Sequence, residues 1–331
     1  MTFGFAKGLI FFFIFAVLVV IAGLRPIGLD RDSENYVQIL HVAVSDANLL
    51  EKEPAFWLIN EVNNRFVGGS ASTFFLLFSL VGVYVKLHAI NKLSKFFYLS
   101  LLLYISFYFI LHEMTQIRVG VAAGFFLLAV RDYFKGKLLC YFLNVFLACL
   151  FHYSAVLCFA LLFIRRKGFN PVFYCLLPFL SFCFGVLFDV SILRALATFL
   201  PEFLSFKILL YIDLLSEDRH SDINVFNFYY ASIAFLYLFF VLNYRKIADP
   251  FDLFMLKVLG FGISFFFMLS FLPVLAFRVS EFFLVVMIVL LADLALLFKQ
   301  RVIYFTLIGM WALAYFVTQG IMKNLNLEVL F

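Results

Sequence analysis

Long apolar segments separated by short polar loops run through almost the whole chain, and they constrain its fold more than any other feature. A helix needs about 20 mostly apolar residues to cross a bilayer, and about eleven such segments fit the sequence. Hydrophobic residues make up 66% of the chain and charged residues 14%, whereas a soluble domain has roughly a quarter charged residues. The sequence therefore predicts an all-α polytopic membrane protein with no attached soluble enzyme domain.

The loop charges orient these segments. Lys and Arg cluster in alternate loops, which the positive-inside rule assigns to the inner side. Lys86, Lys92 and Lys95 are expected to place one such loop inside. The predicted spans are Phe3–Ile21, Ser72–Ala89, Phe96–Leu111, Ile117–Tyr133, two short helices within Leu138–Ile164, Val172–Phe188, Val225–Asn243, Phe251–Leu272, a span opened by Phe277–Phe283, and Val302–Gly320. On this count the C-terminus lies outside.

The polar segment Arg25–Arg65 is expected outside, where it forms short helices on the membrane surface. Its apolar positions recur near the helical period, at Tyr36, Val37, Leu40 and Val44. This spacing is typical of an interfacial amphipathic helix. Glu53-Pro54 is expected to end it, and Phe56–Phe66 to form a second short helix. The segment Asp189–Asn224 is a second polar stretch assigned to the outer side.

The segment Leu138–Ile164 is too short for two full crossings, although basic clusters at both of its ends point inward. Two crossings need about 40 residues. The sequence therefore predicts a re-entrant pair of short helices that meet at FHYSA, Phe151–Ala155. Such breaks are tolerated at membrane depth where they line a cavity.

Four polar groups interrupt apolar segments on the predicted outer side. They are Gly28–Tyr36, His112–Gly120, Phe151–Ala155 and Phe277–Phe283. Ionisable residues at this depth are costly and usually functional. Gly120 and Gly124 follow Arg118 in a GxxxG spacing that allows close helix packing. We expect the four groups to converge on one face, with Arg118 at the centre of the fold.

Arg118 and Arg278 are candidate ligands for a diphosphate, since each is predicted to begin a helix and arginine grips phosphate oxygens with a planar fork. The alternative is a structural pair with Glu113 or Glu281, or snorkelling to lipid headgroups. Gln116, His112, Tyr36 and Glu281 are further candidates for substrate contacts. Asn60 and Tyr211 are weaker candidates for a sugar site.

Several side chains are candidates for the base that removes a proton from an attacking hydroxyl. The carboxylates are Asp30, Asp32, Glu113 and Glu281, and His152 is the candidate imidazole. Asp30 and Asp32 fit a helix N-cap before Ser33–Leu40 equally well. His152 fits a hydrogen bond that fastens its turn equally well.

Other chemistries have little support in the sequence. His112, Glu113 and His152 lack the spacing of common metal motifs, so neither a metal nor another cofactor is expected. The five cysteines lie in apolar segments without a CxxC and predict no disulfide framework. Basic residues are scattered among loops and form no stripe, which argues against nucleic acid as a partner.

The motifs resemble those of the EpsG-like group of bacterial Wzy-type oligosaccharide-repeat polymerases. TQIRVGVAAG and FHYSA resemble the two central motifs of that group, N/T-Q-x-R-x-G/Q-x-A and F-H-x-S-A. GLDRDSENY, EPAFWLIN (Glu53–Asn60) and FRVSEFF resemble an early G-x-D…Y segment, an E-P-x-F/Y-x-L-x-N segment and a late R-x-x-x-Y/F-F segment. Two acids, Asp30 and Asp32, compete here for the single Asp of the early segment.

The resemblance implies a GT-C-like glycosyltransferase of the bacterial inner membrane. Such proteins polymerise oligosaccharide repeat units on undecaprenyl diphosphate at the periplasmic face. The implied partners are lipid-linked donor and acceptor, membrane lipids and a polysaccharide chain-length regulator. Two alternatives stay open: an O-antigen ligase, and a non-enzymatic lipid-linked oligosaccharide flippase. The gathering of polar groups on one face and the absence of a repeat favour the enzyme.

A single transmembrane domain over residues 1–326 is expected. The last five residues, LEVLF at Leu327–Phe331, resemble the start of an engineered protease site. They are therefore left out of the functional assignment.

Overall fold

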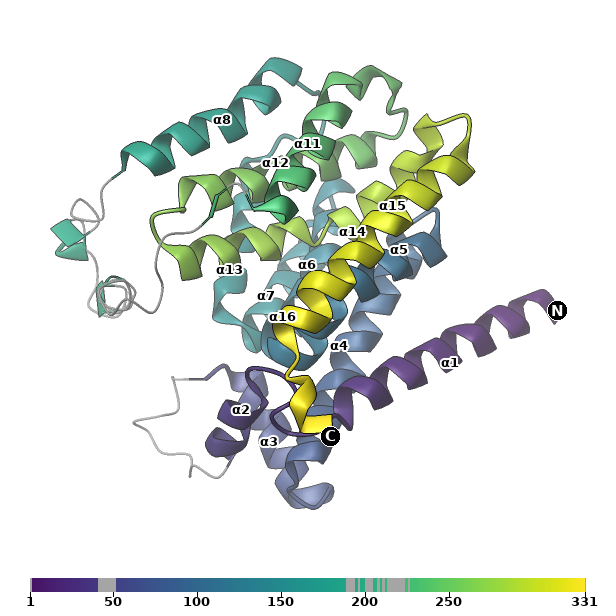
Figure 1. Ribbon diagram of the computed structural model, residues 1–331, viewed down its shortest axis with the longest axis vertical. Helices are drawn as coiled ribbons and strands as arrows, with labels where there is room; N and C mark the ends of the chain where they lie inside the picture. The colour runs from purple at the N-terminus through teal and green to yellow at the C-terminus, as the bar shows by residue number, and fades with distance from the viewer. Residues whose placement is uncertain are drawn as a thin grey trace. The chain divides into compact units, whose positions relative to one another are not determined.

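The structure, a computed structural model, describes residues 2–40, 52–188 and 224–330 except 226, with isolated positions between 194 and 212. Helix accounts for 82% of it, and the described part contains no strand. The all-α prediction is confirmed (Figure 1). Contacts divide the chain into two compact units. Unit 1 comprises Met1–Phe163 with Ile288–Phe331, and unit 2 comprises Ile164–Met287.

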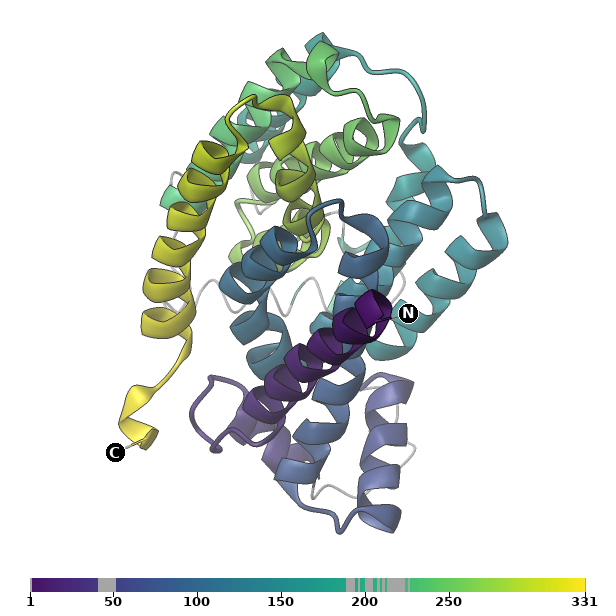
Figure 2. The same cartoon turned by 90° about the vertical axis from the view of Figure 1, so that its right-hand side faces the viewer.

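Unit 1 contains the first helices of the chain and the last ones. The first are α1 (Thr2–Gly23), α2 (Ser33–Leu40), α3 (Pro54–Phe66), α4 (Ala71–Leu93), α5 (Phe97–Tyr104), the π-helical η1 (Ile105–Thr115), α6 (Ile117–Phe134), α7 (Leu138–Phe151) and the 3₁₀-helical η2 (Tyr153–Phe163). The last are α14 (Met287–Asp293), η4 (Leu294–Leu297), α15 (Arg301–Tyr315), η5 (Phe316–Ile321), α16 (Met322–Asn324) and η6 (Leu327–Leu330). Helix α4 packs against α1, α3 and α6, and α6 packs against α7. Figure 2 shows α3 and α4 side by side.

Unit 2 is built around one central helix. Its described elements are α8 (Pro171–Leu187), α11 (Phe228–Leu242), η3 (Tyr244–Lys246), α12 (Pro250–Met268) and α13 (Pro273–Leu284). Helix α12 packs against α8, α11 and α13. Val44, Tyr211 and most of the second polar stretch lie outside the described residues.

Local signals in the sequence fix where several helices begin. The side chains of Ser70, Asn170, Asn227 and Asp249 each accept a hydrogen bond from a backbone N–H in the first turn of the following helix. Such N-caps satisfy donors that the helix itself leaves unpaired. Proline occupies the first turn of α3, α8, α12 and α13, where its missing N–H costs nothing.

The apolar helices coincide with the predicted spans, and the chain is membrane-embedded. By length and composition, four described helices are able to cross a bilayer: Ala71–Leu93, Phe97–Thr115, Pro250–Met268 and Arg301–Asn324. The broken pair Leu275–Leu284 and Met287–Leu297 makes a fifth if it forms one span. Five further apolar helices of 10–17 residues are shorter than a full span. These helices support a polytopic protein, while the count of eleven stays a prediction.

Helices α7 and η2 confirm the expected pair of short helices. They pack against each other on either side of His152. His152 has an extended backbone (φ −153°, ψ 118°), and its N–H donates to the Ala148 carbonyl at 2.9 Å. Two short helices, α2 and α3, are also present in the segment Arg25–Arg65, while their location on the membrane surface stays a prediction.

An aromatic cluster joins α2, α3, α4 and α6 inside unit 1. Its buried members are Tyr36, Phe56, Phe74, Phe75, Phe78, Ile117 and Val121. The rings of Phe74 and Phe78 lie 4.9 Å apart in tilted contact, a geometry that aromatic pairs favour. Because the cluster includes Ile117, it fixes the start of α6 directly before Arg118.

The C-terminal segment returns to the loop that precedes α2. Asn326 N–H donates to the Leu29 carbonyl at 2.7 Å, Asp30 and Leu325 form an antiparallel bridge, and the Arg31 guanidinium donates to the Lys323 carbonyl. Both segments therefore lie on the same side of unit 1.

Candidate functional site

A single carboxylate, Glu53, connects three segments that are far apart in the sequence. One of its oxygens, Oε2, accepts from Nη1 of Arg118 in α6. The other, Oε1, lies 2.9 Å from Nδ1 of His152 and 3.3 Å from the backbone N of Tyr153. The Glu53 side chain is only 4% exposed, against 21% for Arg118 and 14% for His152. We call Glu53, Arg118 and His152 the Glu53 triad.

The sequence around Glu53 explains how it reaches both partners. Pro54 follows it, and a residue before proline is pushed towards extended backbone. Glu53 has φ −70° and ψ 151°, and it precedes the first turn of α3. Its side chain therefore lies outside α3 and contacts Arg118 of α6 and His152 at the break between α7 and η2.

Arg118 occupies the second position of α6, as predicted. Its guanidinium carbon lies 5.9 Å from the centroid of the Tyr36 ring, within the range of a cation–π contact. Its Nε is buried and has no hydrogen-bond partner among the described residues. The predicted structural pairing with Glu113 is therefore wrong, because Glu53 takes that role.

The electrostatics of the triad keep Glu53 ionised at neutral pH. Burial is the largest single influence and raises the carboxyl pKa, but the hydrogen bond from His152, the charges of Arg118 and His152, and a backbone hydrogen bond together outweigh it. The net result lowers the pKa of Glu53 from 4.5 to about 2. Burial also raises the pKa of the Tyr36 hydroxyl, although the Arg118 guanidinium opposes this.

The protonation of His152 follows from its partner. An ionised carboxylate only accepts hydrogen bonds, so the proton of neutral His152 resides on Nδ1. Nε2 then carries a lone pair. Among the described residues, no side chain or backbone group forms a hydrogen bond with Nε2. The imidazole is thus held in one orientation by Glu53, and its role as a base stays a prediction.

Asp30 is a structural residue in this geometry. Its Oδ2 lies 2.6 Å from Nε of Arg25, and both side chains are buried. Its Oδ1 accepts from the backbone N of Asp32 and of Ser33, where α2 begins. Asp30 therefore stabilises the start of α2 from two residues before the N-cap position, which Asp32 occupies. Asp32 immediately precedes α2, and its carbonyl accepts from Tyr36 N–H at 3.0 Å.

His112 and Glu113 belong to a different group of buried polar side chains. Lys86 Nζ lies 3.0 Å from His112 Nδ1 and 3.5 Å from Glu113 Oε1. The Tyr104 hydroxyl donates to Glu113 Oε1 at 2.9 Å. We call Lys86, Tyr104, His112 and Glu113 the Lys86 cluster. Lys86 lies within the predicted span Ser72–Ala89 and is fully buried in α4, so it does not face the inner loop that it was expected to mark together with Lys92 and Lys95.

The remaining candidates divide between the two units. Gln116 is the residue before α6, and its Oε1 is buried without a hydrogen-bond partner in the described part of the chain. Arg278 and Glu281 lie on α13 of unit 2, where Arg278 is exposed and Glu281 is half-buried. Arg278 is the sixth residue of α13, so the prediction that it begins a helix is wrong. Its role as a diphosphate ligand stays a prediction.

The packing of glycines confirms the close approach expected behind Arg118. A Cβ at Gly120 would lie 2.1 Å from the His112 carbonyl oxygen, and one at Gly124 would lie 2.8 Å from Val85. Neither distance leaves room for a larger residue. The GxxxG spacing therefore packs α6 against η1 and α4.

The sequence matches the EpsG family over residues 8–325. The chain belongs to the EpsG family. No curated protein and no solved structure gave a match. Membership associates the chain with polymerase-type glycosyltransferase activity in polysaccharide biosynthesis. The resemblance drawn from the short motifs is thereby confirmed.

Sequence reasoning missed the central residue of this EpsG-family site. Glu53 stood out only as the first residue of the motif EPAFWLIN, and no pairing with Arg118 was expected. Three of the four predicted polar groups do meet within unit 1. Arg118 and His152 both contact Glu53, and the Tyr36 ring lies beside the Arg118 guanidinium. The fourth, Phe277–Phe283, belongs to unit 2.

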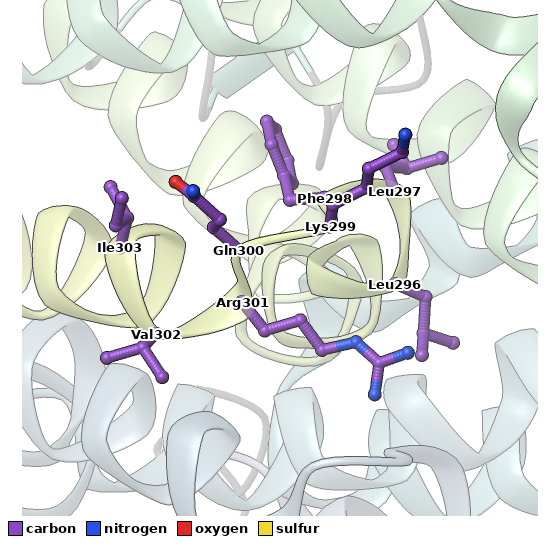
Figure 3. Close-up of a pocket in the computed structure, with 8 residues that line it drawn as sticks. All are labelled: Leu296, Leu297, Phe298, Lys299, Gln300, Arg301, Val302 and Ile303. Carbon is purple, nitrogen blue, oxygen red and sulfur yellow. The ribbon is translucent and has the colours of Figure 1, made fainter.

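An open hollow of about 660 Å³ surrounds the turn between η4 and α15 (Figure 3). It is lined by residues 296–303, and the side chains of Lys299 and Arg301 project from the turn. None of these residues belongs to the Glu53 triad or the Lys86 cluster. The hollow therefore adds nothing to the candidate site.

Proposed function

We propose that this EpsG-family chain polymerises oligosaccharide repeat units carried on undecaprenyl diphosphate. Glycosyl transfer would occur at the periplasmic face of the bacterial inner membrane, where it serves surface polysaccharide or O-antigen synthesis. The donor and acceptor are both lipid-linked, and a chain-length regulator is the proposed protein partner. Family membership and the apolar helices support the assignment.

The observation that carries this proposal is the Glu53 triad. It places an arginine beside a histidine whose second ring nitrogen has no hydrogen-bond partner among the described residues, and one ionised carboxylate orients both. Transfer from a lipid diphosphate needs these two functions together. One group must stabilise the negative charge of the departing diphosphate, and another must take a proton from the attacking hydroxyl.

Each residue then has a defined role. The donor sugar C1–O bond to diphosphate breaks, and the diphosphate leaves with the electron pair near Arg118. The acceptor hydroxyl oxygen forms the new bond to C1, while its proton passes to His152 Nε2. Glu53 holds the Nδ1–H of His152 and the guanidinium of Arg118, and its pKa of about 2 makes it a poor base itself.

The exposure of the triad fits an enzyme better than a buried structural pair. Arg118 retains a fifth of its side-chain surface and His152 about a seventh, so substrate oxygens have access to both. A flippase would need polar groups along a path between the two faces. The triad instead concentrates where the N-terminal ends of α3 and α6 meet the break between α7 and η2.

A reconstituted reaction tests this function. The purified protein would be placed in liposomes with the lipid-linked oligosaccharide that accumulates in cells lacking its gene, without nucleotide sugars. We expect a ladder of products that increase by one repeat unit. The Arg118→Ala variant should give none, and Arg131→Ala, at the other end of α6, should behave as wild type. Transport of the glycolipid across the bilayer without any ladder would contradict the proposal and favour the flippase.

A further inference from the structure

Lys86 is a buried cation that the proposed chemistry does not use. It projects from the interior of α4, and its side chain is 0% exposed. A charged side chain at this depth is costly unless it is paired. Its Nζ meets three acceptors: His112 Nδ1 at 3.0 Å, Glu113 Oε1 at 3.5 Å and the Gly120 carbonyl at 3.1 Å. These contacts match the three donors of an ammonium group.

The three acceptors lie on opposite sides of a break in the chain. His112 and Glu113 belong to the end of η1, while Gly120 belongs to the first turn of α6. Gln116 separates the two helices with a non-helical backbone (φ −97°, ψ 57°). Lys86 therefore connects both sides of the break from a third helix. Arg118 is the second residue after that break.

Close packing leaves this connection little freedom. A Cβ at Gly82 of α4 would lie 2.2 Å from Glu113 Oε2, and one at Gly120 would lie 2.1 Å from the His112 carbonyl oxygen. The Glu113 carboxylate thus packs directly against α4 at Gly82, and the backbone of α6 meets that of η1 at Gly120. A shift of Lys86 or its partners would move the first turn of α6, and Arg118 with it.

We propose that Lys86 is a positioning residue that fixes the position of the Arg118 side chain relative to the bound diphosphate. This inference rests on the proposed function, because it takes Arg118 as the diphosphate ligand. Lys86 itself touches no substrate. It acts by holding η1 and α6 at a fixed angle on both sides of Gln116.

The test uses variants that keep the buried charges balanced. Lys86→Met alone leaves Glu113 without its cation and is expected to be strongly destabilised. The double variant Lys86→Met with Glu113→Gln removes both charges and should fold. Lys86→Arg keeps the cation. Lys257→Met, which removes a buried lysine from α12 of unit 2 whose Nζ donates to the Arg165 carbonyl, is the matched control.

The readout is the affinity of each purified variant for undecaprenyl diphosphate, which requires no knowledge of the sugars. We expect the double variant to bind about tenfold more weakly than wild type, Lys86→Arg to recover most of the affinity, and Lys257→Met to leave it unchanged. In an Arg118→Ala background, the double change should weaken binding no further. This non-additivity is the signature of action through Arg118.

The outcomes separate this inference from the function on which it rests. If combining Arg118→Ala with the double change lowers the affinity by the product of the two separate fold-losses, Lys86 acts independently of Arg118 and the inference is overturned. Unchanged affinity in a folded double variant overturns it equally. Wild-type protein that does not bind undecaprenyl diphosphate contradicts the proposed function instead. In that case, backbone hydrogen exchange at residues 116–120 tests the positioning role. Faster exchange in the double variant than in wild type supports the role, and equal exchange overturns it.

Discussion

Two regions of unit 1 each combine one carboxylate, one cation and one histidine, yet they are organised in opposite ways. In the Glu53 triad the carboxylate is central and binds both Arg118 and His152. In the Lys86 cluster the cation is central and donates to both His112 and Glu113. The central group decides which nitrogen of the histidine carries the proton. His152 is protonated on Nδ1, whereas His112 must accept from the ammonium there.

Exposure separates the two regions further. The side chains of the triad retain 4–21% of their surface, while Lys86 and Glu113 retain 0% and 2%. The side chain of His152 is 14% exposed, and its Nε2 has no hydrogen-bond partner in the part of the chain that the structure describes. His112 Nε2 is buried and has no hydrogen-bond partner within the described residues. The same residue types therefore form a partly exposed group in one place and an almost fully buried group in the other.

The largest effect is expected from the two histidines. A general base contributes typically 10²- to 10⁴-fold, so His152→Gln should lower kcat by about that factor. His112→Gln should leave kcat within about tenfold of wild type, because it removes no base. The comparison is measured by repeat-unit transfer in liposomes. Equal losses in the two variants would contradict the distinction between the regions.

Loss of the central charge should affect stability most in the buried region. Lys86→Met leaves Glu113 unpaired, and breaking a buried ion pair costs about 3–5 kcal/mol. Thermal unfolding in detergent should therefore show a large decrease in midpoint temperature. Adding Glu113→Gln should restore most of it. A single variant as stable as wild type would show that this pair is not buried as described.

Arg118 should matter more for rate than for folding. Removing one group that stabilises developing charge costs about 10²- to 10³-fold in kcat. We expect Arg118→Ala to show this loss in the transfer assay and Arg118→Lys to retain part of the rate, since lysine keeps the charge and loses the fork. Full activity of Arg118→Ala would remove the triad from the proposed chemistry.

The acid dependence of stability probes Glu53 directly. Its pKa is lowered from 4.5 to about 2, so the ionised form contributes stability that is fully present above about pH 4.5. That contribution disappears as the pH falls towards 2, and its size is on the order of 3 kcal/mol. Wild type should therefore be more stable than Glu53→Gln at neutral pH, and the difference should close below pH 4.5. A difference that does not change with pH would argue against an ionised Glu53.

The smallest effect is expected from a cysteine-labelling experiment that tests the membrane topology of unit 1, which contains both regions. Residues before α2 pair with the segment at Leu325, so the chain crosses the membrane an even number of times between them. Single cysteines at Glu34 and Lys323, in a variant without the five native cysteines, should react with an impermeant reagent from the same side. Labelling from opposite sides would contradict the pairing.

Much of the helical framework was predictable because it depends on local sequence. Apolar segments gave the spans, and the break at His152 followed from the short segment Leu138–Ile164. Arg118 was expected at the start of a helix and is found there. These features depend on residues that are near each other in the chain.

The centres of both regions were not predictable, because they depend on contacts across long sequence separations. Glu53 lies 65 residues from Arg118 and 99 from His152. Lys86 was grouped with Lys92 and Lys95 as a sign of the inner side, because basic residues cluster at that end of membrane spans. Its partners on η1 and α6 allow it to stay inside. No pattern along the sequence indicated which carboxylate would pair with which arginine, lysine or histidine.

The most direct test of the account is the structure of the full chain with undecaprenyl diphosphate bound, determined by cryo-electron microscopy in lipid nanodiscs. The account predicts diphosphate oxygens against the guanidinium of Arg118, with Glu53 still bound to His152 Nδ1 and with Nε2 facing open space beside the diphosphate. Diphosphate bound elsewhere, with Arg118 contacting Glu53 alone, would contradict the central role of the triad.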